Sequence, residues 1–230
     1  MTHLLYIFAL LLAILRVEAF YSKISGFGRQ WSQTGLAAAH ENLLAKVQAT
    51  VPKGSVVVIK YGGHAMEDAS LAQFFCEDVA DLKRMGISPV VVHGGGPQIK
   101  AMLADLQVES TFVNGLRMTD PETMRVVQMV LCGTINKNIV AAISAQSGVR
   151  GAIGLSGLDS GLITARRVST DLGLVGEPVH VDTSLLQDVI NMDVVPVIAP
   201  VGREEGVGGP IQALNINADN VQVSFCIKYR

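Results

Sequence analysis

Two short runs of valine and isoleucine that end in glycines constrain the fold of this chain most strongly. The first, SVVVIKYGG, spans residues 55–63, and the second, PVVVHGGGPQ, spans residues 89–98. Both runs are too short and too rich in β-branched residues for a buried helix, so they predict buried parallel strands. Glycine loops at the carboxyl ends of such strands bring backbone N–H groups close to a ligand. The pattern therefore predicts a phosphate or carboxylate site at that edge of the sheet.

Helical patterns around these runs predict an α/β fold with three layers, α/β/α, and a mostly parallel sheet. Apolar residues at helical spacing in 71–85 predict a helix that connects the two strands by a parallel crossover. Pro97 begins a second predicted helix directly after the glycine loop. A longer helix is expected from Thr119, which has capping-box spacing with Glu122, to about Ala145.

The remaining segments extend the same sheet. Strands are expected at 108–114, 151–156, 163–168, 175–181 and 194–201, and helices at 41–49 and 184–192. The segment 151–156 is expected to be a buried strand, and 163–168 with 175–181 an antiparallel excursion. The prolines of 194–201 belong at the ends of a strand or on an edge, because proline cannot donate to the ladder.

Composition excludes several classes of protein. The hydrophobic fraction of 49% with only 5% aromatic residues favours an α/β protein over an all-β one. A net charge of -2 gives no basic footprint for nucleic acid. Cys76, Cys132 and Cys226 are odd in number and far apart, so they predict reduced thiols, with neither a disulfide framework nor a metal site.

The N-terminal region predicts a two-part leader. The apolar run LLYIFALLLAIL at 4–15 is followed by small residues, which indicates a signal peptide over residues 1–19. The acid-poor segment 20–40 is typical of a transit peptide. Such leaders resemble those of algae whose plastids lie inside extra membranes, so we expect a plastid protein with no stable membrane span after cleavage. Because no Lys or Arg precedes the apolar run, a membrane anchor or a secreted protein is the alternative.

Lys60 stands at the mouth of the first predicted strand, beside Gly62 and Gly63. A lysine there can neutralise phosphate oxygens as a point charge. The alternative is an exposed lysine at a strand end. The loop carries neither the GxxxxGK[ST] pattern of a P-loop nor the GxGxxG pattern of a dinucleotide site.

The stretch His93-Gly94-Gly95-Gly96 before a helix predicts an N-terminal dipole and several N–H groups in one place. That arrangement suits a carboxylate or a phosphoryl group in transfer; the alternative is a tight turn. His64 and His93 have no second ligand at metal spacing, so both are interpreted as local hydrogen-bonding groups.

Polar residues in two later segments complete the candidate site. Arg117 lies between a turn and a helix start, where it could bind a carboxylate bidentately or be a solvated surface residue. Asn215, Asn217 and Asp219 alternate and would point to one side if the chain were extended. Asp219 could orient a lysine or approach a metal; the alternative is that Asn217 or Asp219 caps a helix.

Together these residues resemble the amino-acid kinase superfamily and, within it, the N-acetylglutamate kinase branch. The resemblance covers residues 55 to about 219 in six ordered blocks, VVVIKYGGHAM, VVVHGGGPQI, FVNGLRMTDPETMRVVQMVL, GLSGLDSGLI, VVPVIAPVG and LNINAD. NGLR followed by TDPETM is similar to the arginine-regulated, hexameric members.

The resemblance implies that ATP, with Mg²⁺, phosphorylates the side-chain carboxylate of N-acetyl-L-glutamate in arginine biosynthesis. It implies that Lys60 stabilises the transferring phosphoryl group and that Asp219 orients the lysines. The implied phosphate-binding residues are Gly62 and Gly63, and the implied substrate-binding residues are Gly94, Gly95, Arg117 and Asn215. It also implies a homo-oligomer, a dimer or a hexamer, and the PII signalling protein as a partner.

Two departures from the family pattern shape the remaining expectations. After LNINAD the family continues into a lobe that binds the nucleotide, whereas this chain reads NVQVSFCIKYR, and Leu158 stands where lysine is usual. We therefore expect residues 41–230 to be an incomplete kinase domain that lacks most of the ATP lobe and is an inactive fragment. The alternatives are a carbamate, aspartate or uridylate kinase, or a non-catalytic protein that binds acylglutamate or arginine.

Overall fold

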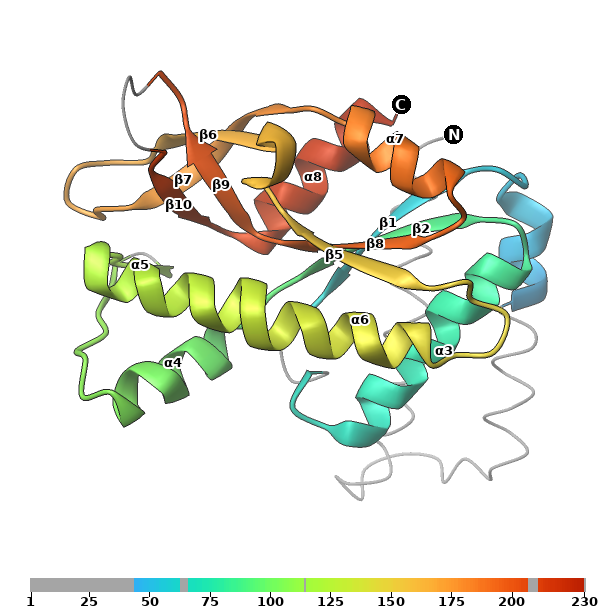
Figure 1. Ribbon diagram of the computed structural model, residues 1–230, viewed down its shortest axis with the longest axis horizontal. Coiled ribbons are helices and arrows are strands. Elements are labelled where there is room, and N and C mark those ends of the chain that lie inside the picture. Colours follow the sequence, from blue (N-terminus) through green and yellow to red (C-terminus); the bar gives the residue numbers. More distant parts are fainter. Residues whose placement is uncertain (1–43, 63–65, 114, 207–210, 230) are drawn as a thin grey trace.

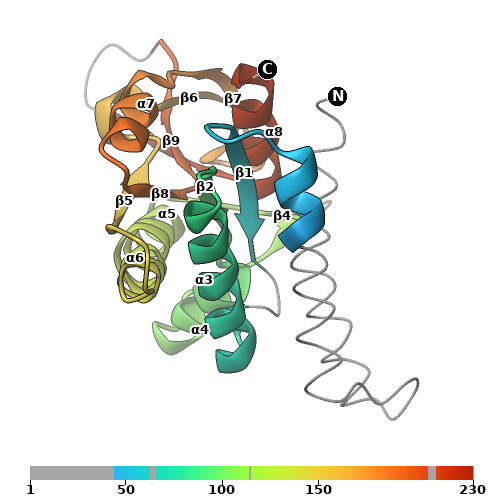
Figure 2. The same ribbon diagram turned by 90° about the vertical axis from the view of Figure 1, so that its right-hand side faces the viewer.

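A computed structural model describes residues 44–62, 66–113, 115–206 and 211–229. The predicted signal peptide and presequence, together with Gly63 and His64, lie outside the described residues. A helix covers residues 44–50 and overlaps the segment 41–49, where a helix was expected. Figure 2 shows this helix beside the sheet.

Four parallel strands form the central sheet, in the order β1-β2-β8-β5. Their bounds are β1 (Val56–Tyr61), β2 (Ser88–His93), β8 (Val195–Ala199) and β5 (Ala152–Ser156). The register places Tyr61 opposite His93 and Ser156 opposite Ala199. All four strands therefore end at one edge, which confirms that both glycine loops follow parallel strands at the same side of the sheet.

Helices cover both faces of this sheet and confirm the predicted three layers (Figure 1). One face carries α3 (Ala69–Arg84) and a long helix made of α5 (Pro121–Gln128), η2 (Met129–Ile135) and α6 (Asn136–Ser144). The shorter helix α4 (Gly96–Asp105) packs against α5 and η2. The opposite face carries α7 (Ser184–Asn191) and α8 (Ala218–Lys228).

A closed four-stranded barrel adjoins the carboxyl edge of the sheet. It consists of β10 (Ala213–Ile216), β7 (Val175–Val181), β6 (Ile163–Arg167) and β9 (Val201–Glu204), in that order. The predicted antiparallel excursion is confirmed as the β6–β7 pair. The expected strand 108–114 shrinks to β3 (Phe112–Val113), which pairs with β4 (Leu116–Arg117) in a hairpin.

Two predictions about strands were wrong. β5 is an edge strand rather than a buried one, and Ile153 is 38% exposed. The expected strand 194–201 divides at Pro200 into β8 and β9, and Pro196 lies inside β8. Pro196 is tolerated there because pairing of β8 with β2 begins only at Val197, so its missing N–H removes no rung on that side.

The predicted cap of the long helix was also wrong. Asp120, not Thr119, is the N-cap residue, and its carboxylate accepts the N–H of Thr123 at 2.7 Å. The hydroxyl of Thr119 instead donates to the carbonyl oxygen of Arg117 at 2.8 Å. Thr119 is buried, which assigns it to the interior rather than to the helix end.

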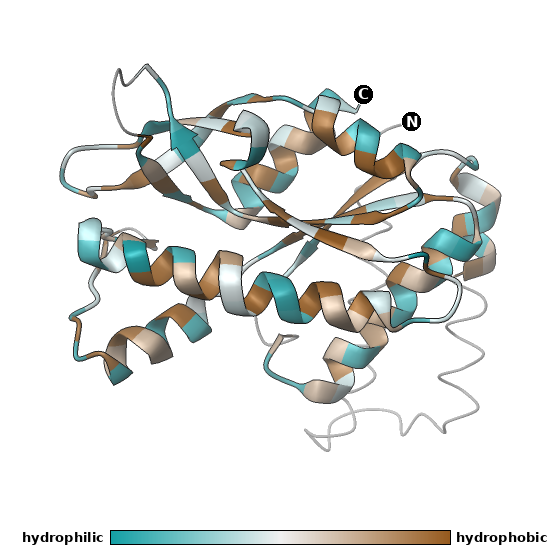
Figure 3. Cartoon of the chain, viewed as in Figure 1, coloured by the Kyte–Doolittle hydropathy of each residue, from teal (hydrophilic) through white to brown (hydrophobic). Residues whose placement is uncertain are grey.

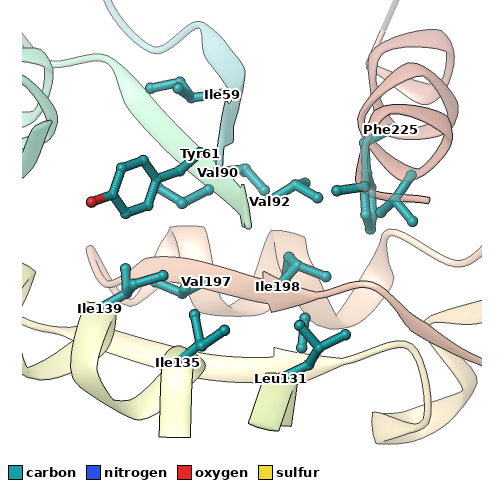
Figure 4. Close-up of a cluster of buried hydrophobic side chains, with 14 of the residues drawn as sticks. Ile59, Tyr61, Val90, Val92, Leu131, Ile135, Ile139, Val197, Ile198 and Phe225 are labelled. Carbon is teal, nitrogen blue, oxygen red and sulfur yellow. The ribbon is translucent and has the colours of Figure 1, made fainter. Parts of the chain in front are cut away.

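The long helix is apolar enough, by length and composition, to cross a membrane over Pro121–Ser144. The hydropathy colouring shows apolar and hydrophilic residues interspersed along it (Figure 3), and its buried apolar residues form a stripe. Residues of this buried stripe recur every four positions: Val127, Leu131, Ile135, Ile139 and Ile143. A four-residue step overshoots an α-helical turn by about 40°, and the wider turn of the π segment η2 corrects this drift. Leu131, Ile135 and Ile139 thus reach Val197 and Ile198 of β8 (Figure 4).

Candidate functional site

A cleft of about 240 Å³ opens where β1 and β2 end, between the sheet, the barrel and the β3–β4 hairpin. It contains every predicted site residue that lies within the described part of the chain. These residues are Lys60, Gly62, Gly94, Gly95, Arg117, Asn215 and Asp219. The predicted phosphate-binding Gly63 lies outside the described residues. The roles implied for these side chains stay predictions, but the fold brings the side chains together.

Lys60 and Asp219 form an ion pair across the cleft. Lys60 is on β1 and Asp219 on the first turn of α8, and the Nζ to Oδ1 distance is 3.2 Å. The side chains are 30% and 61% exposed, so the pair contributes little to stability. The ion pair matters for geometry, because the carboxylate of Asp219 holds the ammonium group of Lys60 in the cleft. A Cβ on Gly62 would lie 3.2 Å from Cε of Lys60, so glycine leaves room for that side chain.

The amino end of α4 lines the same cleft. Gly95 is the N-cap of this helix and makes no side-chain capping hydrogen bond, and Pro97 occupies the first turn. A Cβ on Gly95 would lie 2.4 Å from Cδ1 of Ile135 and 2.6 Å from Cδ2 of Leu131. Glycine is therefore required for this close approach, which fixes the positive end of the helix dipole at the cleft. That end suits a negatively charged group.

Gly94 differs from its neighbour. Its N–H donates to the carbonyl oxygen of Tyr61 at 2.7 Å and so continues the β1–β2 ladder beyond the strands. In this structure the N–H of Gly94 is therefore already hydrogen-bonded to Tyr61 and does not point to a substrate. The substrate-binding roles of Gly94 and Gly95 stay predictions.

His93 is a buried structural residue, as expected for a local hydrogen-bonding group. Its Nδ1 lies 2.9 Å from the carbonyl oxygen of Gly94, and its Nε2 lies 3.2 Å from Nδ2 of Asn136. Asn136 also donates to the carbonyl oxygen of Val197 at 2.9 Å. Burial lowers the pKa of His93 to about 4, so the ring is neutral at pH 7, with Nδ1 donating and Nε2 accepting. Asn136 was not singled out from the sequence, because nothing in its helical context marks it.

Arg117 is buried rather than solvated, so the surface alternative is wrong; the side chain is only 6% exposed. Its guanidinium donates to the hydroxyl of Ser110 and to the carbonyl oxygen of Gly96, the latter at 3.0 Å. Cζ of Arg117 lies 4.5 Å from the ring centroid of Phe112. Burial lowers the pKa of Arg117, but an arginine stays protonated in proteins. A positive charge is thus presented at the cleft.

Asn215 connects the barrel to this arginine. Its Nδ2 donates to the hydroxyl of Thr119 at 3.2 Å, and that hydroxyl donates to the carbonyl oxygen of Arg117. The backbone of Thr119 also pairs with Leu172 and Leu174. Thr119 is therefore a positioning residue that the capping interpretation concealed.

The segment that carries Asn215, Asn217 and Asp219 is extended only as far as Ile216, where β10 ends. α8 begins at Ala218, and Asn217 is its N-cap, with Oδ1 accepting the N–H of Asp219 at 2.8 Å. The capping alternative is thus confirmed for Asn217. Asp219 follows in the first helical turn, where its carboxylate reaches Lys60.

The chemistry of this cleft can be tested against Mg²⁺. Within the described ranges, no group of three or more His, Cys, Asp and Glu side chains is placed to hold a metal ion. The cleft residues include the carboxylate of Asp219. Mg²⁺ commonly keeps several waters and binds through one or two carboxylates together with substrate phosphates. The donor set therefore fits Mg²⁺ delivered with a nucleotide rather than in a cage of protein ligands.

Comparison with known proteins gives two sets of relatives. At the sequence level, acetylglutamate kinase of Rhodospirillum centenum is 50% identical over 179 residues, 72% of this chain and 57% of the relative. Acetylglutamate kinase of Gluconacetobacter diazotrophicus is 48% identical over 178 residues, 72% of this chain and 55% of the relative. The chain thus spans little more than half the length of these curated relatives.

Solved structures share the fold. The smu.665 protein of Streptococcus mutans matches with a TM-score of 0.67 and 27% identity, over 75% of this chain and 68% of that one. N-acetylglutamate synthase of Neisseria gonorrhoeae, complexed with coenzyme A and L-arginine, matches with a TM-score of 0.67 over 84% of this chain and 45% of that one. At 22% identity it shows the fold alone. The model of the amino acid kinase family matches residues 55–228, and the chain belongs to this family.

Proposed function

We propose that this chain carries the acylglutamate-binding part of an N-acetylglutamate kinase, which uses ATP to phosphorylate the side-chain carboxylate of N-acetyl-L-glutamate in arginine biosynthesis. The observation that carries the proposal is the cleft itself. Lys60, Asp219, Gly95, Arg117 and Asn215 line it together. They do so in a chain 48–50% identical to proteins named acetylglutamate kinase.

Recognition of the substrate follows from two positive features of the cleft. The guanidinium of Arg117 binds the α-carboxylate through charge-assisted hydrogen bonds. The amino end of α4 at Gly95 stabilises negative charge through its dipole and its N–H groups. Asn215, held by the hydroxyl of Thr119 at 3.2 Å, adds a polar contact on the opposite wall.

Phosphoryl transfer then needs positioning and charge stabilisation. An oxygen of the side-chain carboxylate attacks the γ-phosphorus of ATP, and the bond from that phosphorus to the bridging oxygen breaks, giving an acyl phosphate and ADP. Lys60 neutralises the phosphoryl oxygens as charge develops, and Asp219 holds Lys60 in place. Mg²⁺, bound with the nucleotide, supplies further charge neutralisation at the phosphates.

Calorimetry with the 230-residue chain tests binding. We expect N-acetyl-L-glutamate to bind the wild type and Arg117→Gln to weaken binding at least about ten-fold, since one charge-assisted contact contributes roughly 1.5–3 kcal/mol. Arg150→Gln is the matched control, because Arg150 is exposed and donates to the carbonyl oxygen of Met192 at 2.9 Å, away from the cleft. Equal affinity of the two variants contradicts the proposal.

The same titrations separate the rival functions. Binding of carbamate, aspartate or uridylate in preference to N-acetyl-L-glutamate assigns a different kinase, and binding of L-arginine alone assigns a non-catalytic sensor. Release of ADP, followed by a coupled assay with ATP and Mg²⁺, tests turnover independently of binding.

We also propose, from the N-terminal sequence, that residues 1–40 direct the protein to a plastid. A fluorescent fusion of these residues should accumulate in plastids, and secretion or membrane retention contradicts this. Assembly into a dimer or hexamer is proposed on the resemblance, and analytical ultracentrifugation tests it. Co-purification with the PII protein tests that partnership.

A further inference from the structure

The guanidinium of Arg117 is held from three directions. One N–H donates to the hydroxyl of Ser110, another donates to the carbonyl oxygen of Gly96, and the ring of Phe112 lies 4.5 Å from Cζ. Hydrogen bonds to described residues thus use two of the five guanidinium N–H donors. The ring covers the guanidinium without consuming a donor, which leaves hydrogen-bonding capacity for a ligand.

The hairpin makes this contact a direct cross-strand pair. Phe112 of β3 and Arg117 of β4 are register partners, so their side chains stand on the same face of the ribbon. Each strand has only two residues, and so short a hairpin has little stability of its own. The position of Arg117 therefore depends on side-chain contacts more than on the backbone ladder.

Exposure within the pair is uneven. Phe112 is 54% exposed, whereas Arg117 is 6% exposed, and both side chains line the cleft. A packing role alone would place the ring inside the protein. Here the ring lies on the outer side of the cation and shields it from water, and a cation–π contact is stronger when the cation is desolvated.

We propose that Phe112 is a positioning residue, which orients and shields the guanidinium of Arg117 for the α-carboxylate of the acylglutamate. This inference rests on the proposed function and deepens it, because it names a residue that sets affinity for one carboxylate of the substrate. Phe112 acts through Arg117 and needs no contact of its own with that carboxylate.

The test compares two ligands that differ only in the α-carboxylate. N-acetyl-L-glutamate has this group, and N-acetyl-4-aminobutanoate lacks it. Phe112→Leu keeps apolar bulk but removes the ring, and Phe112→Tyr keeps the ring as the conservative rescue. We expect Phe112→Leu to raise the Kd for N-acetyl-L-glutamate about five-fold, with the tyrosine variant near wild type. The Kd for N-acetyl-4-aminobutanoate should be the same in all three proteins.

Two results overturn the inference. One is an unchanged Kd for N-acetyl-L-glutamate in Phe112→Leu, and the other is an equal loss for both ligands, which assigns Phe112 to packing alone. A double-mutant cycle adds a check, since Phe112→Leu should have no further effect when Arg117 is already glutamine.

Failure of the proposed function gives a distinct result. If the wild type binds neither ligand, the proposed function fails, and NMR relaxation of the Nε–H group of Arg117 then tests whether Phe112 holds the guanidinium in place. Restricted motion of this group in wild type and Phe112→Tyr, with greater motion in Phe112→Leu, supports the positioning role. Equal motion in all three proteins overturns it.

Discussion

The two walls of the cleft are built in opposite ways. The wall that carries Lys60 and Gly95 continues from strands whose residues are buried almost completely between two helix layers. The wall that carries Arg117 is a hairpin with two residues in each strand and exposed apolar side chains. The first wall is held by the core of the domain, and the second by a few polar contacts. Rigidity at this site is thus concentrated on the side where we propose phosphoryl transfer.

Removing Asn136 should have the largest effect on the sheet wall. Asn136→Ala leaves Nε2 of His93 and the carbonyl oxygen of Val197 buried without this partner, so we expect about 3 kcal/mol of destabilisation. Urea unfolding measures the loss. Asn138→Ala, an exposed residue of the same helix, is the control and should change stability by less than about 0.5 kcal/mol. Similar losses in both variants would contradict a special role for the buried amide.

Acid should weaken the same wall through His93. The pKa of His93 is lowered from 6.5 to about 4 in the folded state, so the unfolded chain binds more protons between these values. The stability that the neutral ring contributes is complete above pH 6.5 and is lost as the pH falls toward 4. By pH 5 we expect the free energy of unfolding to fall by about 2 kcal/mol. Urea unfolding at pH 8 and pH 5 measures it, with His93→Gln expected to show a flatter profile. An unchanged profile in that variant contradicts the assignment.

A methyl group at Gly95 tests the close packing of the glycine loop against the long helix. Gly95→Ala pushes against Ile135 and Leu131, and we expect about 1.5 kcal/mol of destabilisation together with loss of acylglutamate binding. Gly96→Ala is the matched control for stability, because a Cβ there meets no atom within 4 Å. Thermal unfolding and calorimetry on both variants check the result. Equal behaviour of the two variants would show that the close approach at Gly95 is unimportant.

The smallest effect is expected in the hairpin. Val113 is exposed on β3, so Val113→Ala should change the free energy of unfolding by less than about 0.5 kcal/mol. A loss above 1 kcal/mol, measured by urea unfolding, would show that the hairpin belongs to the core after all and would remove the contrast between the walls.

The same contrast explains which parts of the site could be predicted from the sequence. Local sequence patterns mark the sheet wall, because its strands are valine runs that end in glycines. β1, β2 and the glycine loops were therefore predictable. The hairpin wall depends on contacts between distant residues. Thr119 pairs with Asn215 across 96 positions, and the sheet wall also contains a pair of this kind, Asn136 with His93 across 43 positions. A single sequence does not display such pairs, and the capping-box spacing at Thr119 pointed to a different role.

Local pattern also misjudged burial at the edge of the sheet. The segment GAIGLS has the apolar composition of a central strand, yet β5 pairs on one side only, with β8. Strand order is decided by the crossover connections and not by hydrophobicity. Pro196 was misplaced for a related reason, because its neighbours in the sheet could not be known.

The π segment between α5 and α6 determines how the long helix responds to a change in its length. A deletion of Gly133 would shorten the wide turn, which is where the fold absorbs the mismatch between helix period and stripe. The wide turn would then close into an ordinary α-helical turn, and the residues beyond it would keep their face toward the sheet. A one-residue deletion in α5 or α6 would instead rotate everything beyond it by about 100° and present different side chains to the sheet. A one-residue change in length is therefore absorbed at this turn, whereas the same change elsewhere in the long helix replaces the contact surface beyond it.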